Sequence, residues 1–500
     1  MDKNLQILKR LVIIIFIVGF LIRIPGFFVS PLSFHPTRQY RSALIARKIF
    51  FLLCPQKAQK WQIEFLKRHS PPLLEPPIYE SIVALTYKIY GKENLLFPKI
   101  FSTLAWIVSA IFIFFIQREL NSIYAGIFSL LYFLFIPFGI KASRSFQPDL
   151  FMILFFTVYC WYLIKNRNSF NFKNITLLGL LGLLSALFKP ITLFFIATTS
   201  LIAFLSYNKT PVKNRIFKLI IFSLICFSPV FLYYIYGIIK FNSLQNQADM
   251  SFVPDLYFQA KYYLGWIRKI DVACSTPAFL LAFLALFLLK KEKDNEQKLF
   301  FRRFYYSLWV GYLAYGLIFN YHIHTHDYYQ LPFIIIISLG VGYTMESIMK
   351  YMKKSYKISE VHFVIMTFIF MLIIPFTDRK VIWFSQDKYN TRIAIMKEIG
   401  EIVEHSDRCI LSTYGWGKPI EYYGYTTGLI LSKTILAKND DEIIKDFERM
   451  KDRINAEYFI INNIKYLKIL KREKKLFWKY LKVNYPVFKE GEGYIIFKLS

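Results

Sequence analysis

The sequence predicts a polytopic α-helical membrane protein with about eleven transmembrane helices and a water-soluble α/β domain at its C-terminal end. Of the 500 residues, 55% are hydrophobic, and 52 are Phe and 35 are Tyr. Apolar runs recur along the chain, and a bilayer core requires about 20 apolar residues for each helix. The runs are continuous rather than alternating. They therefore predict helices, which satisfy their own backbone hydrogen bonds in lipid, rather than the strands of a barrel.

The expected spans follow one another from the N-terminus to residue 376. The first comes after Lys3, Lys9 and Arg10, and it is interpreted as an uncleaved span because Ile22 to Pro25 offers no small-residue cleavage site. The eleven expected segments are 11–27, 99–117, 122–141, 148–164, 174–188, 191–207, 216–237, 275–290, 304–320, 331–348 and 358–376.

Alternate connections between these spans are rich in Lys and Arg, which marks the cytoplasmic side. The basic connections are 165–173, 209–218, 290–303 and 350–357, and the basic N-terminus lies on the same side. The net charge of +30 is thereby explained by topology, and no nucleic-acid partner is expected. The remaining segments, 28–98, 238–274 and 377–500, are expected outside the cytoplasm. The predicted location is the cytoplasmic (inner) membrane of a bacterium.

Two domains are expected. Residues 1–376 form a transmembrane catalytic region whose long outer loop, 28–98, carries juxtamembrane helices, one of them amphipathic from Tyr40 onward. Residues 377–500 form an extracytoplasmic α/β domain, a length sufficient for a small core. Short strands are expected at 381–384, 409–412, 458–461 and 494–497, and helices at 440–455 and 466–481.

Polar residues at the ends of transmembrane helices are candidates for function, and here they gather on the outer side. The stretch before Ala43 holds Arg38, Gln39 and Arg41. Further along the same loop, Glu75 lies between Pro71-Pro72 and Pro76-Pro77. Glu80 follows, and its position at a helix start fits a carboxylate that stabilises the helix dipole.

The next outer turns contribute one charged residue each. Asp149 precedes an apolar helix, where it can act as an N-cap, as a catalytic group or as both. Lys189 precedes Pro190 between two spans, where it can extend to the membrane surface or bind a lipid phosphate.

A histidine-rich stretch precedes the tenth expected span, from His322 to Pro332. Alternating His with Asp fits a metal site, but there is no accompanying carboxylate cluster, so a divalent metal is disfavoured and no cofactor is expected. Contacts to a phosphate or sugar are favoured, and the candidates are His324, His326, Asp327, Tyr328 and Tyr329. The sequence contains neither a GxGxxG nor a GxxxxGK[ST] motif, so no soluble nucleotide site is predicted.

The order of these motifs resembles that of the GT-C fold glycosyltransferases. The similarity is to the branch that contains protein O-mannosyltransferases and the aminoarabinose transferase of lipid A. It rests on a first span, a long outer loop with Ile45-Ala46-Arg47, a Pro-rich acidic stretch, an Asp at the next outer turn, a Lys-Pro at the third and Tyr328-Tyr329-Gln330-Leu331-Pro332 before a late span. It covers residues 1–376.

The resemblance implies an enzyme that moves one sugar from a polyprenyl-phosphate carrier to a lipid, glycan or protein acceptor outside the cytoplasm. Glu75 is then the first choice for the general base and Asp149 the second, while the basic residues hold the leaving phosphate. Many members carry an acidic residue before the juxtamembrane helix, but here Thr37 to Tyr40 contains none. Either another carboxylate acts, or the acceptor needs less activation, or the chain has another activity.

Two other function classes fit a membrane protein of this kind. One is a transporter or flippase of lipid-linked glycan, for which internal repeats and broken helices at the membrane midplane are typical. The sequence shows neither. The other is a glycan polymerase or ligase, which also uses outer Arg and His residues.

Overall fold

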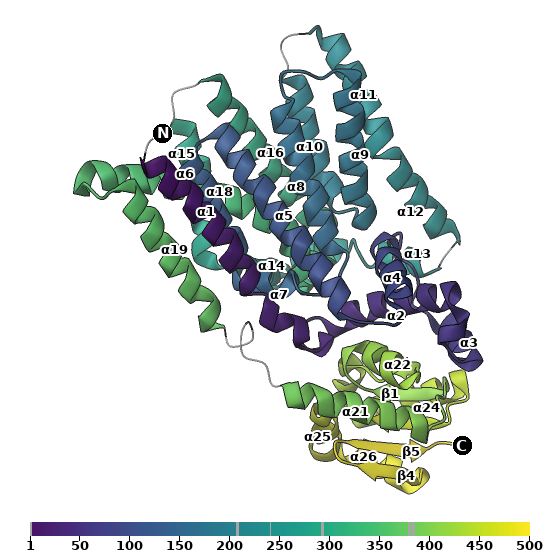
Figure 1. The fold of residues 1–500 in the computed structure, drawn as a ribbon. Helices are drawn as coiled ribbons and strands as arrows, with labels where there is room; N and C mark the ends of the chain where they lie inside the picture. Colours follow the sequence, from purple (N-terminus) through teal and green to yellow (C-terminus); the bar gives the residue numbers. More distant parts are fainter. Residues whose placement is uncertain (1–2, 207–209, 241, 292–294, 379–380, 382–385) are drawn as a thin grey trace.

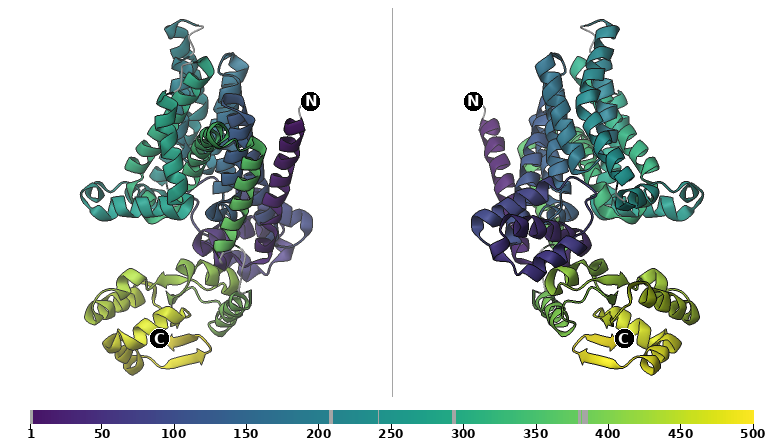
Figure 2. Two further views of the ribbon diagram at one scale, coloured as in Figure 1. Left: turned by 90° about the vertical axis from the view of Figure 1, so that its left-hand side faces the viewer. Right: turned by 90° about the vertical axis from the view of Figure 1, so that its right-hand side faces the viewer.

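The structure is a computed structural model that describes residues 3–206, 210–240, 242–291, 295–378, 381 and 386–500. It consists of a large helical bundle with a smaller α/β unit attached at one end (Figure 1). The N-terminus lies at the far end of the bundle, and the C-terminus lies in the smaller unit (Figure 2). Residues 28–98 fill the space between the two parts.

Long apolar helices form the bundle. Helix α5 packs against α6 and α8, and α8 packs against α9. Helix α18, from much later in the chain, packs against α6 and α15. The bundle helices are α1 (Lys3–Leu21), α5 (Leu96–Leu120), α6 (Ile123–Phe135), α8 (Asp149–Lys165), α9 (Phe172–Phe188), α10 (Thr192–Leu205), α11 (Val212–Cys226), α12 (Ser228–Lys240), α15 (Thr276–Lys291), α16 (Glu296–Ile318), α18 (Leu331–Tyr356) and α19 (Glu360–Thr377).

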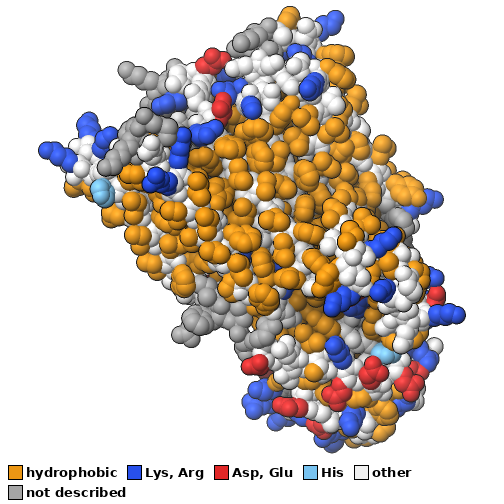
Figure 3. Space-filling model, viewed as in Figure 1, with side chains coloured by type: hydrophobic (Ala, Val, Ile, Leu, Met, Phe, Trp, Pro, Cys, Tyr) orange, Lys and Arg blue, Asp and Glu red, His pale blue; other side chains and the backbone are white. Residues whose placement is uncertain are grey.

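The chain is an integral membrane protein. Helices occupy each of the eleven apolar segments, but the number of spans stays a prediction. By length and composition, four helical stretches of the described chain can cross a membrane, and six can if two bent pairs each count as one span. A broad band of hydrophobic side chains covers the bundle, with Lys and Arg at its ends (Figure 3). The four single spans are Asn4–Phe28, Leu96–Leu120, Asp327–Tyr356 and Glu360–Thr377.

Short helices cover the end of the bundle that faces the smaller unit. They include α14, which meets α15 at an angle of 100° across Ser275, a residue with a positive φ of 62°. These elements are η1 (Ile24–Phe28), η2 (Pro31–Ser33), α2 (Pro36–Leu53), η3 (Pro55–Lys57), α3 (Lys60–His69), α4 (Ile78–Tyr90), α7 (Pro137–Ala142), α13 (Asn242–Asp249), η4 (Pro254–Phe258), α14 (Ala260–Cys274), α17 (Asn320–Thr325) and η5 (Asp327–Gln330).

The smaller unit contains a five-stranded sheet in the order β2-β1-β3-β5-β4. The pairs of β1 with β2 and β3 are parallel, and those of β5 with β3 and β4 are antiparallel. The strands are β1 (Cys409–Ser412), β2 (Gly428–Ile430), β3 (Tyr458–Ile461), β4 (Val487–Gly491) and β5 (Tyr494–Lys498). The helices are α21 (Gln386–Ile402), η6 (Gly415–Gly417), α22 (Lys418–Gly424), α23 (Lys433–Leu436), α24 (Asp440–Ile454), α25 (Ile464–Arg472) and α26 (Lys475–Asn484).

Both faces of the central strands are buried, which explains their continuous apolar sequence. Ile410 and Phe459 pack in one core with α24 and α26, while Leu411 and Ile460 on the opposite face share a core with α21. The expected strands at 409–412, 458–461 and 494–497 are therefore confirmed, as is the helix expected at 440–455. The strand expected at 381–384 lies outside the described residues apart from Val381.

The helix expected at 466–481 is divided into α25 and α26. The backbone leaves the helical region at Lys474, with φ −111° and ψ 57°. The break allows Leu470 from the first helix and Phe477 and Leu481 from the second to enter the same core. Burial of three large side chains outweighs the loss of helical hydrogen bonds at one turn.

Protein covers most of helix α2, although its last residues, Leu52 and Leu53, are exposed. Leu44 and Ala46 are completely buried, and the helix packs against α4 on one side and α22 on the other. Arg47 joins the two parts. Its Nε and Nη2 atoms donate to the carboxylate of Glu93 at 2.7 and 2.9 Å, and its guanidinium lies 3.6 Å from the ring centroid of Tyr422.

Candidate active site

Three residues that lie far apart in the sequence meet in one buried ion cluster. Lys189 Nζ lies 2.6 Å from Asp149 Oδ1, and Arg38 Nη2 lies 2.8 Å from Asp149 Oδ2. Asp149 is completely buried and Lys189 nearly so, while the Arg38 side chain is 22% exposed. A buried carboxylate with both oxygens bound to cations is a group that fixes the position of those cations.

Proline residues explain how the chain brings these side chains together. Asp149 follows Pro148 and opens α8, where the helix dipole favours a carboxylate. Lys189 precedes Pro190, which disfavours a helical backbone at the residue before it. Helix α9 accordingly ends at Phe188, and Lys189 is extended, with φ −166°.

Two tyrosines cover the cations. The Lys189 ammonium lies 4.1 Å from the ring centroid of Tyr329 and 4.8 Å from that of Tyr328. The Arg38 guanidinium lies 4.4 Å from the Tyr328 ring. Aromatic faces stabilise cations, particularly at sites withdrawn from water. The Tyr-Tyr pair in η5 therefore forms one wall of the cation cluster.

Asp327 pairs with a residue that the sequence did not single out. His35 Nε2 lies 2.9 Å from Asp327 Oδ1, and the His35 ring contacts that of Tyr328. His35 has a left-handed backbone, φ 42°, immediately before Pro36. Strained backbone of this kind is common at functional sites, but the sequence offered only the position of His35 beside the candidate stretch.

The remaining candidate histidines occupy different positions. His326 packs against Tyr328 and Tyr329, whereas His324 faces the α14 side, where its ring contacts Tyr262. Burial, followed by the charge of Arg38, lowers the pKa of His326 to about 4. His326 is therefore neutral near pH 7, so it can hydrogen-bond a ligand but adds no positive charge.

A pocket adjoins the cluster on the Arg38 side. Its charged lining residues are two cations, Arg38 and Arg41, and two carboxylates, Glu75 and Glu80. The prolines around Glu75 also line it. The two basic residues and the first-choice base of the sequence analysis thus share one cavity.

Glu80 is the more deeply placed carboxylate. It is 5% exposed, and its Oε1 atom accepts a hydrogen bond of 2.7 Å from Ser42 Oγ. Burial raises the pKa of Glu80 to about 7, against the lowering effect of this hydrogen bond. Its position in the first turn of α4 agrees with the helix-dipole interpretation, but its burial and altered pKa were not predictable from sequence.

Gln39 points away from the ion cluster. Its Nε2 atom donates to the carbonyl oxygens of Pro31, at 3.2 Å, and Phe34. Its Oε1 atom accepts from the backbone N–H of Phe146 at 2.9 Å. The side chain therefore connects α2 to two neighbouring turns. Arg41 has a mixed environment, because it lines the pocket and also donates to the carbonyl of Pro72.

Within the described residues, no group of three or more His, Cys, Asp and Glu side chains has an arrangement that could hold a metal ion. His322, His324 and His326 instead make contacts with neighbouring protein groups. His322 Nε2 lies 3.1 Å from Ser251 Oγ, and Nδ1 of His324 lies 2.7 Å from the carbonyl oxygen of Asn320.

Comparison with known proteins gives one family match in sequence. Residues 74–234 match the family model described as dolichyl-phosphate-mannose-protein mannosyltransferase. The matched segment contains Glu75, Asp149 and Lys189 but not Arg38 or the His322 to Pro332 stretch. No curated protein matches the chain significantly in sequence.

Solved structures match almost the whole chain in fold. ArnT from Cupriavidus metallidurans aligns in its apo state with a TM-score of 0.58 and 9% identity, covering 98% of both chains. Its complex with undecaprenyl phosphate aligns with a TM-score of 0.56, 8% identity and the same coverage. The archaeal oligosaccharyltransferase AglB from Archaeoglobus fulgidus, in complex with an inhibitory peptide and a dolichol-phosphate, aligns with a TM-score of 0.56 and 9% identity, covering 98% of this chain and 74% of that chain.

Proposed function

Because the chain has the GT-C glycosyltransferase fold, we propose that it is a membrane glycosyltransferase that uses a polyprenyl-phosphate sugar as donor. The acceptor is a lipid, a glycan or a protein that presents a hydroxyl group. The observation that carries the proposal is the position of two cations, Arg38 and Lys189, on one buried carboxylate beside a pocket that contains Glu75.

Arg38 and Lys189 fit the leaving phosphate. Transfer of a sugar from a phosphate carrier develops negative charge on the phosphate oxygen, and fixed cations stabilise that charge strongly in a site with little water. Asp149 keeps both cations in place before the donor binds. The rings of Tyr328 and Tyr329 lie against the same two cations.

Glu75 fits the general base. In the proposed step the acceptor oxygen attacks the anomeric carbon, and the bond from that carbon to the phosphate oxygen breaks. The bonding electron pair leaves with the polyprenyl phosphate, and the acceptor proton passes to the Glu75 carboxylate. General-base assistance is typically worth 10²- to 10⁴-fold in rate, about 3 to 5 kcal/mol.

Asp149 is the weaker choice for the base in this proposal. Its two oxygens already bind Lys189 and Arg38. Protonation of Asp149 during the reaction would leave two buried cations without their counterion, which is costly. We therefore assign Asp149 a positioning role. In this proposal Glu75 takes the place of the acidic residue that is absent from Thr37 to Tyr40.

The start of α8 and the end of α9, which carry the site, lie at the end of the bundle that faces the smaller unit, and the α8–α9 connection lies at the other end (Figure 1). Lys350 and Lys353 of α18 are exposed at that other end. Since Lys and Arg in short loops mark the cytoplasmic side, we propose that the N-terminus is cytoplasmic and that the active site and residues 377–500 lie outside. Residues 377–500 then act as a separate domain that covers the outer rim and helps to select the acceptor.

Sugar transfer can be tested on the purified full-length protein with a polyprenyl-phosphate sugar that is radiolabelled in the sugar, in the presence of a cell-envelope extract as acceptor. The proposal expects label to move from the donor lipid to an acceptor, and it expects Glu75→Gln to slow this movement. A lipid-linked glycan transporter would carry the intact donor across a vesicle membrane without breaking the sugar–phosphate bond. If the donor stays intact and crosses the membrane, the chain is a transporter and the glycosyltransferase proposal is wrong.

A further inference from the structure

Helices α25 and α26 of the C-terminal unit carry a strong excess of positive charge. Between Ile464 and Asn484 there are eight Lys and Arg residues and one acidic residue, Glu473. Seven of the eight cations are exposed, and the eighth, Lys474, is half-buried. The exposed cations, which we call the basic face, are Lys465, Lys468, Lys471, Arg472, Lys475, Lys479 and Lys482.

The spacing of these residues places most of them in one stripe on each helix. In α25 three cations follow one another at spacings of three and four residues, and in α26 three follow at spacings of four and three. Residues with these spacings are neighbours on one side of a helix. Leu470, Phe477 and Leu481 from the other sides of the helices are completely buried in the core of the unit. The stripes are Lys465, Lys468 and Arg472 in α25 and Lys475, Lys479 and Lys482 in α26.

Trp478 connects the cations of the two helices. Its ring centroid lies 5.4 Å from Nζ of Lys471 in α25 and 5.7 Å from Nζ of Lys482 in α26. The two helices also pack directly against each other. The cations of both helices therefore belong to one surface.

The basic face has little compensating negative charge of its own. Among the described residues, the one ion pair of this face joins Lys471 Nζ to Glu490 Oε1 at 3.6 Å. The neighbouring carboxylate of Asp440 has other partners, because it accepts from two backbone N–H groups at the start of α26 and lies 4.0 Å from Lys474 Nζ. Like charges three or four residues apart on a helix repel one another. An anionic partner would therefore stabilise this surface.

Helix α24 of the same unit has a different surface charge. Its exposed charged residues are three acidic and three basic ones, so both signs alternate along the helix. Mixed charge of this kind is sufficient for solubility, and the excess of one sign on α25 and α26 therefore needs another explanation. The six residues of α24 are Asp441, Glu442, Lys445, Arg449, Asp452 and Arg453.

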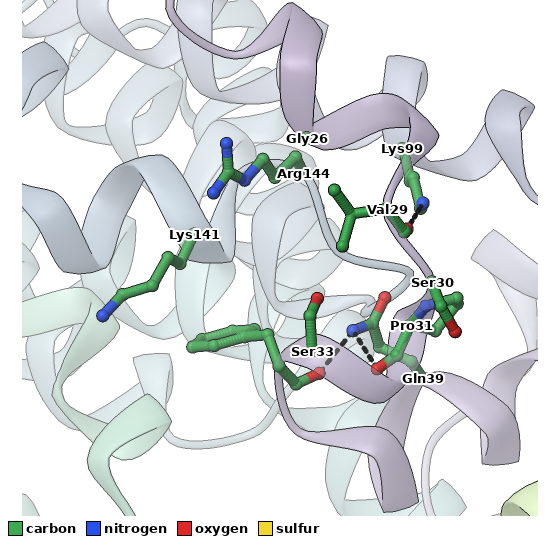
Figure 4. A pocket seen from close by; sticks show the side chains of 10 residues that line it. Gly26, Val29, Ser30, Pro31, Ser33, Gln39, Lys99, Lys141 and Arg144 are labelled. Carbon is green, nitrogen blue, oxygen red and sulfur yellow. Dashed lines mark hydrogen bonds between the residues drawn. The ribbon is translucent and has the colours of Figure 1, made fainter. Parts of the chain in front are cut away.

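The buried cations of the bundle differ from the basic face because protein groups surround them. Lys99, Lys141 and Arg144 line a second pocket together with Gln39 (Figure 4). Lys141 Nζ lies 2.8 Å from the carboxylate of Asp378, Arg144 donates to a backbone carbonyl at 2.6 Å, and Lys99 donates to two. This pocket has its own partners, so it does not require an anion from outside.

The position of the basic face argues against a membrane surface as its partner. Helices α25 and α26 lie farther from the bundle than α22, which packs against α2 (Figure 1). The face is therefore distant from the membrane that the bundle crosses. Six of its seven cations are lysines, which present single charges on flexible stems and lack the two-pronged geometry of Arg. Single charges spread over two helices fit a polymer with repeated negative charges better than one phosphate group.

We propose that the basic face is a docking surface for an anionic glycan polymer, a polysaccharide that carries carboxylate or phosphate groups at repeated positions. The choice of a glycan rests on the proposed function, because a glycosyltransferase meets glycans on the side of the membrane where the C-terminal unit lies. Charge attraction of this kind raises the local concentration of a polymer and the rate at which it binds. Because the face lies away from α22 and α2, the polymer is held close to the enzyme without entering the active site.

Binding of fluorescently labelled polygalacturonate, a carboxylate polymer, to the purified full-length protein in an uncharged detergent tests the proposal. The triple variant Lys468→Gln, Lys475→Gln, Lys479→Gln removes three exposed cations of the face. At low salt it should weaken binding by about tenfold or more. It should also reduce the slope of log Kd against log salt by about 2 to 3, because fewer counterions are released for each polymer bound. Uncharged dextran should bind neither protein.

A second triple variant provides the matched control. Lys397→Gln, Lys433→Gln and Lys445→Gln remove three exposed lysines from α21, α23 and α24, so the net charge of the unit changes equally. This variant should bind the polymer as the parent does. Equal weakening in the two triple variants would overturn the proposal, because binding would then depend on the net charge of the unit and not on the basic face.

The same assay identifies the partner more closely. Tighter binding of poly(glycerol phosphate) than of polygalacturonate would assign the face to phosphate-bearing polymers, and the reverse order would assign it to carboxylate-bearing ones. The protein in phosphatidylcholine nanodiscs should not bind phosphatidylglycerol vesicles. If it binds them more tightly than either polymer, and the first triple variant does not, the face is a membrane-binding surface and the proposal is wrong.

The assay contains no sugar donor, so its outcome is independent of catalysis. Glu75→Gln should bind the polymer as the parent does. Polymer binding by a parent protein that transfers no sugar would reject the proposed function and leave the docking surface in place. Sugar transfer by a parent protein that binds neither polymer would reject the docking surface alone.

Discussion

Lys189 and Asp149 form a buried ion pair with 2.6 Å between Nζ and Oδ1, although forty residues and a complete helical hairpin separate them along the chain. Pro190 and Pro148 place these two residues at the ends of their helices. The pair therefore joins the start of α8 and the α9–α10 connection into one support for Arg38.

The first prediction concerns the stability of this pair. Lys189→Met and Asp149→Asn should each lower the free energy of unfolding by about 3 to 5 kcal/mol, because each leaves a buried charge without its partner. The double variant should lose less than the sum of the two, as chemical or thermal unfolding in nanodiscs can measure. Lys67→Met with Glu64→Gln is the matched control, since this exposed pair on α3 should contribute at most about 1 kcal/mol. Additive losses at Lys189 and Asp149 would contradict the pairing.

The second prediction concerns turnover. Glu75→Gln keeps the shape of the side chain and removes the base. It should lower kcat by about 10²-fold or more with little change in donor affinity. The same substitution at Glu64, which is exposed on α3 outside the pocket, should have no effect. If kcat of Glu75→Gln equals that of the parent, Glu75 is not the base. Asp149, although it binds two cations, would then be tested as the base through Asp149→Asn.

The third prediction is a pH dependence of stability that arises from Glu80. Its pKa is raised by burial from an ordinary value of 4.5 to about 7. The folded protein therefore binds this proton more tightly than the unfolded chain, and the stability that Glu80 contributes falls as pH rises from about 4.5 to about 7. Glu80→Gln, which keeps an acceptor for Ser42, should remove that decrease.

Thermal unfolding of the parent and of Glu80→Gln at pH 5 and at pH 8 measures this effect. The variant should gain stability relative to the parent between the two values, by up to about 3 kcal/mol, because each pKa unit corresponds to about 1.4 kcal/mol. The Glu64→Gln variant should show no such change. Parallel pH profiles for the parent and Glu80→Gln would show that Glu80 is ionised throughout.

The fourth prediction concerns the contact between α2 and the smaller unit. Tyr422→Ala removes the ring beside Arg47 and the hydroxyl that donates to Glu93 at 3.1 Å. Hydrogen exchange should increase in α22 and in the C-terminal half of α2. Tyr422→Phe keeps the ring and should show a smaller increase, because the cation–π contact remains. Equal exchange in the two variants would assign the contact to the hydroxyl alone.

The fifth prediction tests the orientation in the membrane. All five native cysteines are buried, so engineered cysteines can be labelled over a low background. In intact cells, a membrane-impermeant thiol reagent should label Lys479→Cys in α26 and should not label Lys354→Cys near the end of α18. Labelling of the second position in place of the first would reverse the proposed topology.

Local signals in the sequence predicted the strands at 409–412, 458–461 and 494–497, because their apolar runs are short and bounded by turns. The break at Lys474 could not be predicted, since it depends on how Leu470 and Phe477 share a core with strands far away in the chain. The packing of α2 against α22 could not be predicted for the same reason. Its amphipathic pattern is compatible with either lipid or protein as its apolar neighbour.

The sequence predicted which residues belong to the candidate site, but not which of them form ion pairs with one another. Arg38, Asp149 and Lys189 each stand at a helix end in the sequence, yet only the fold shows that one carboxylate binds both cations. His35 could not be identified, because its left-handed backbone and its contact with Asp327 are tertiary properties. Gln39 was predicted to share the donor site with Arg38, but the two adjacent side chains line different pockets.

The attachment of α2 bears on how freely the C-terminal unit could be exchanged with that of another protein. Arg38 and Arg47 lie nine residues apart on one helix, a distance of about 14 Å. One of them holds Asp149, and the other holds Tyr422 and Glu93. In a chimera that replaces the C-terminal unit alone, α2 would keep side chains that fit the original unit and not the new one. The smallest module that could be exchanged therefore consists of α2 together with the unit from α21 onward.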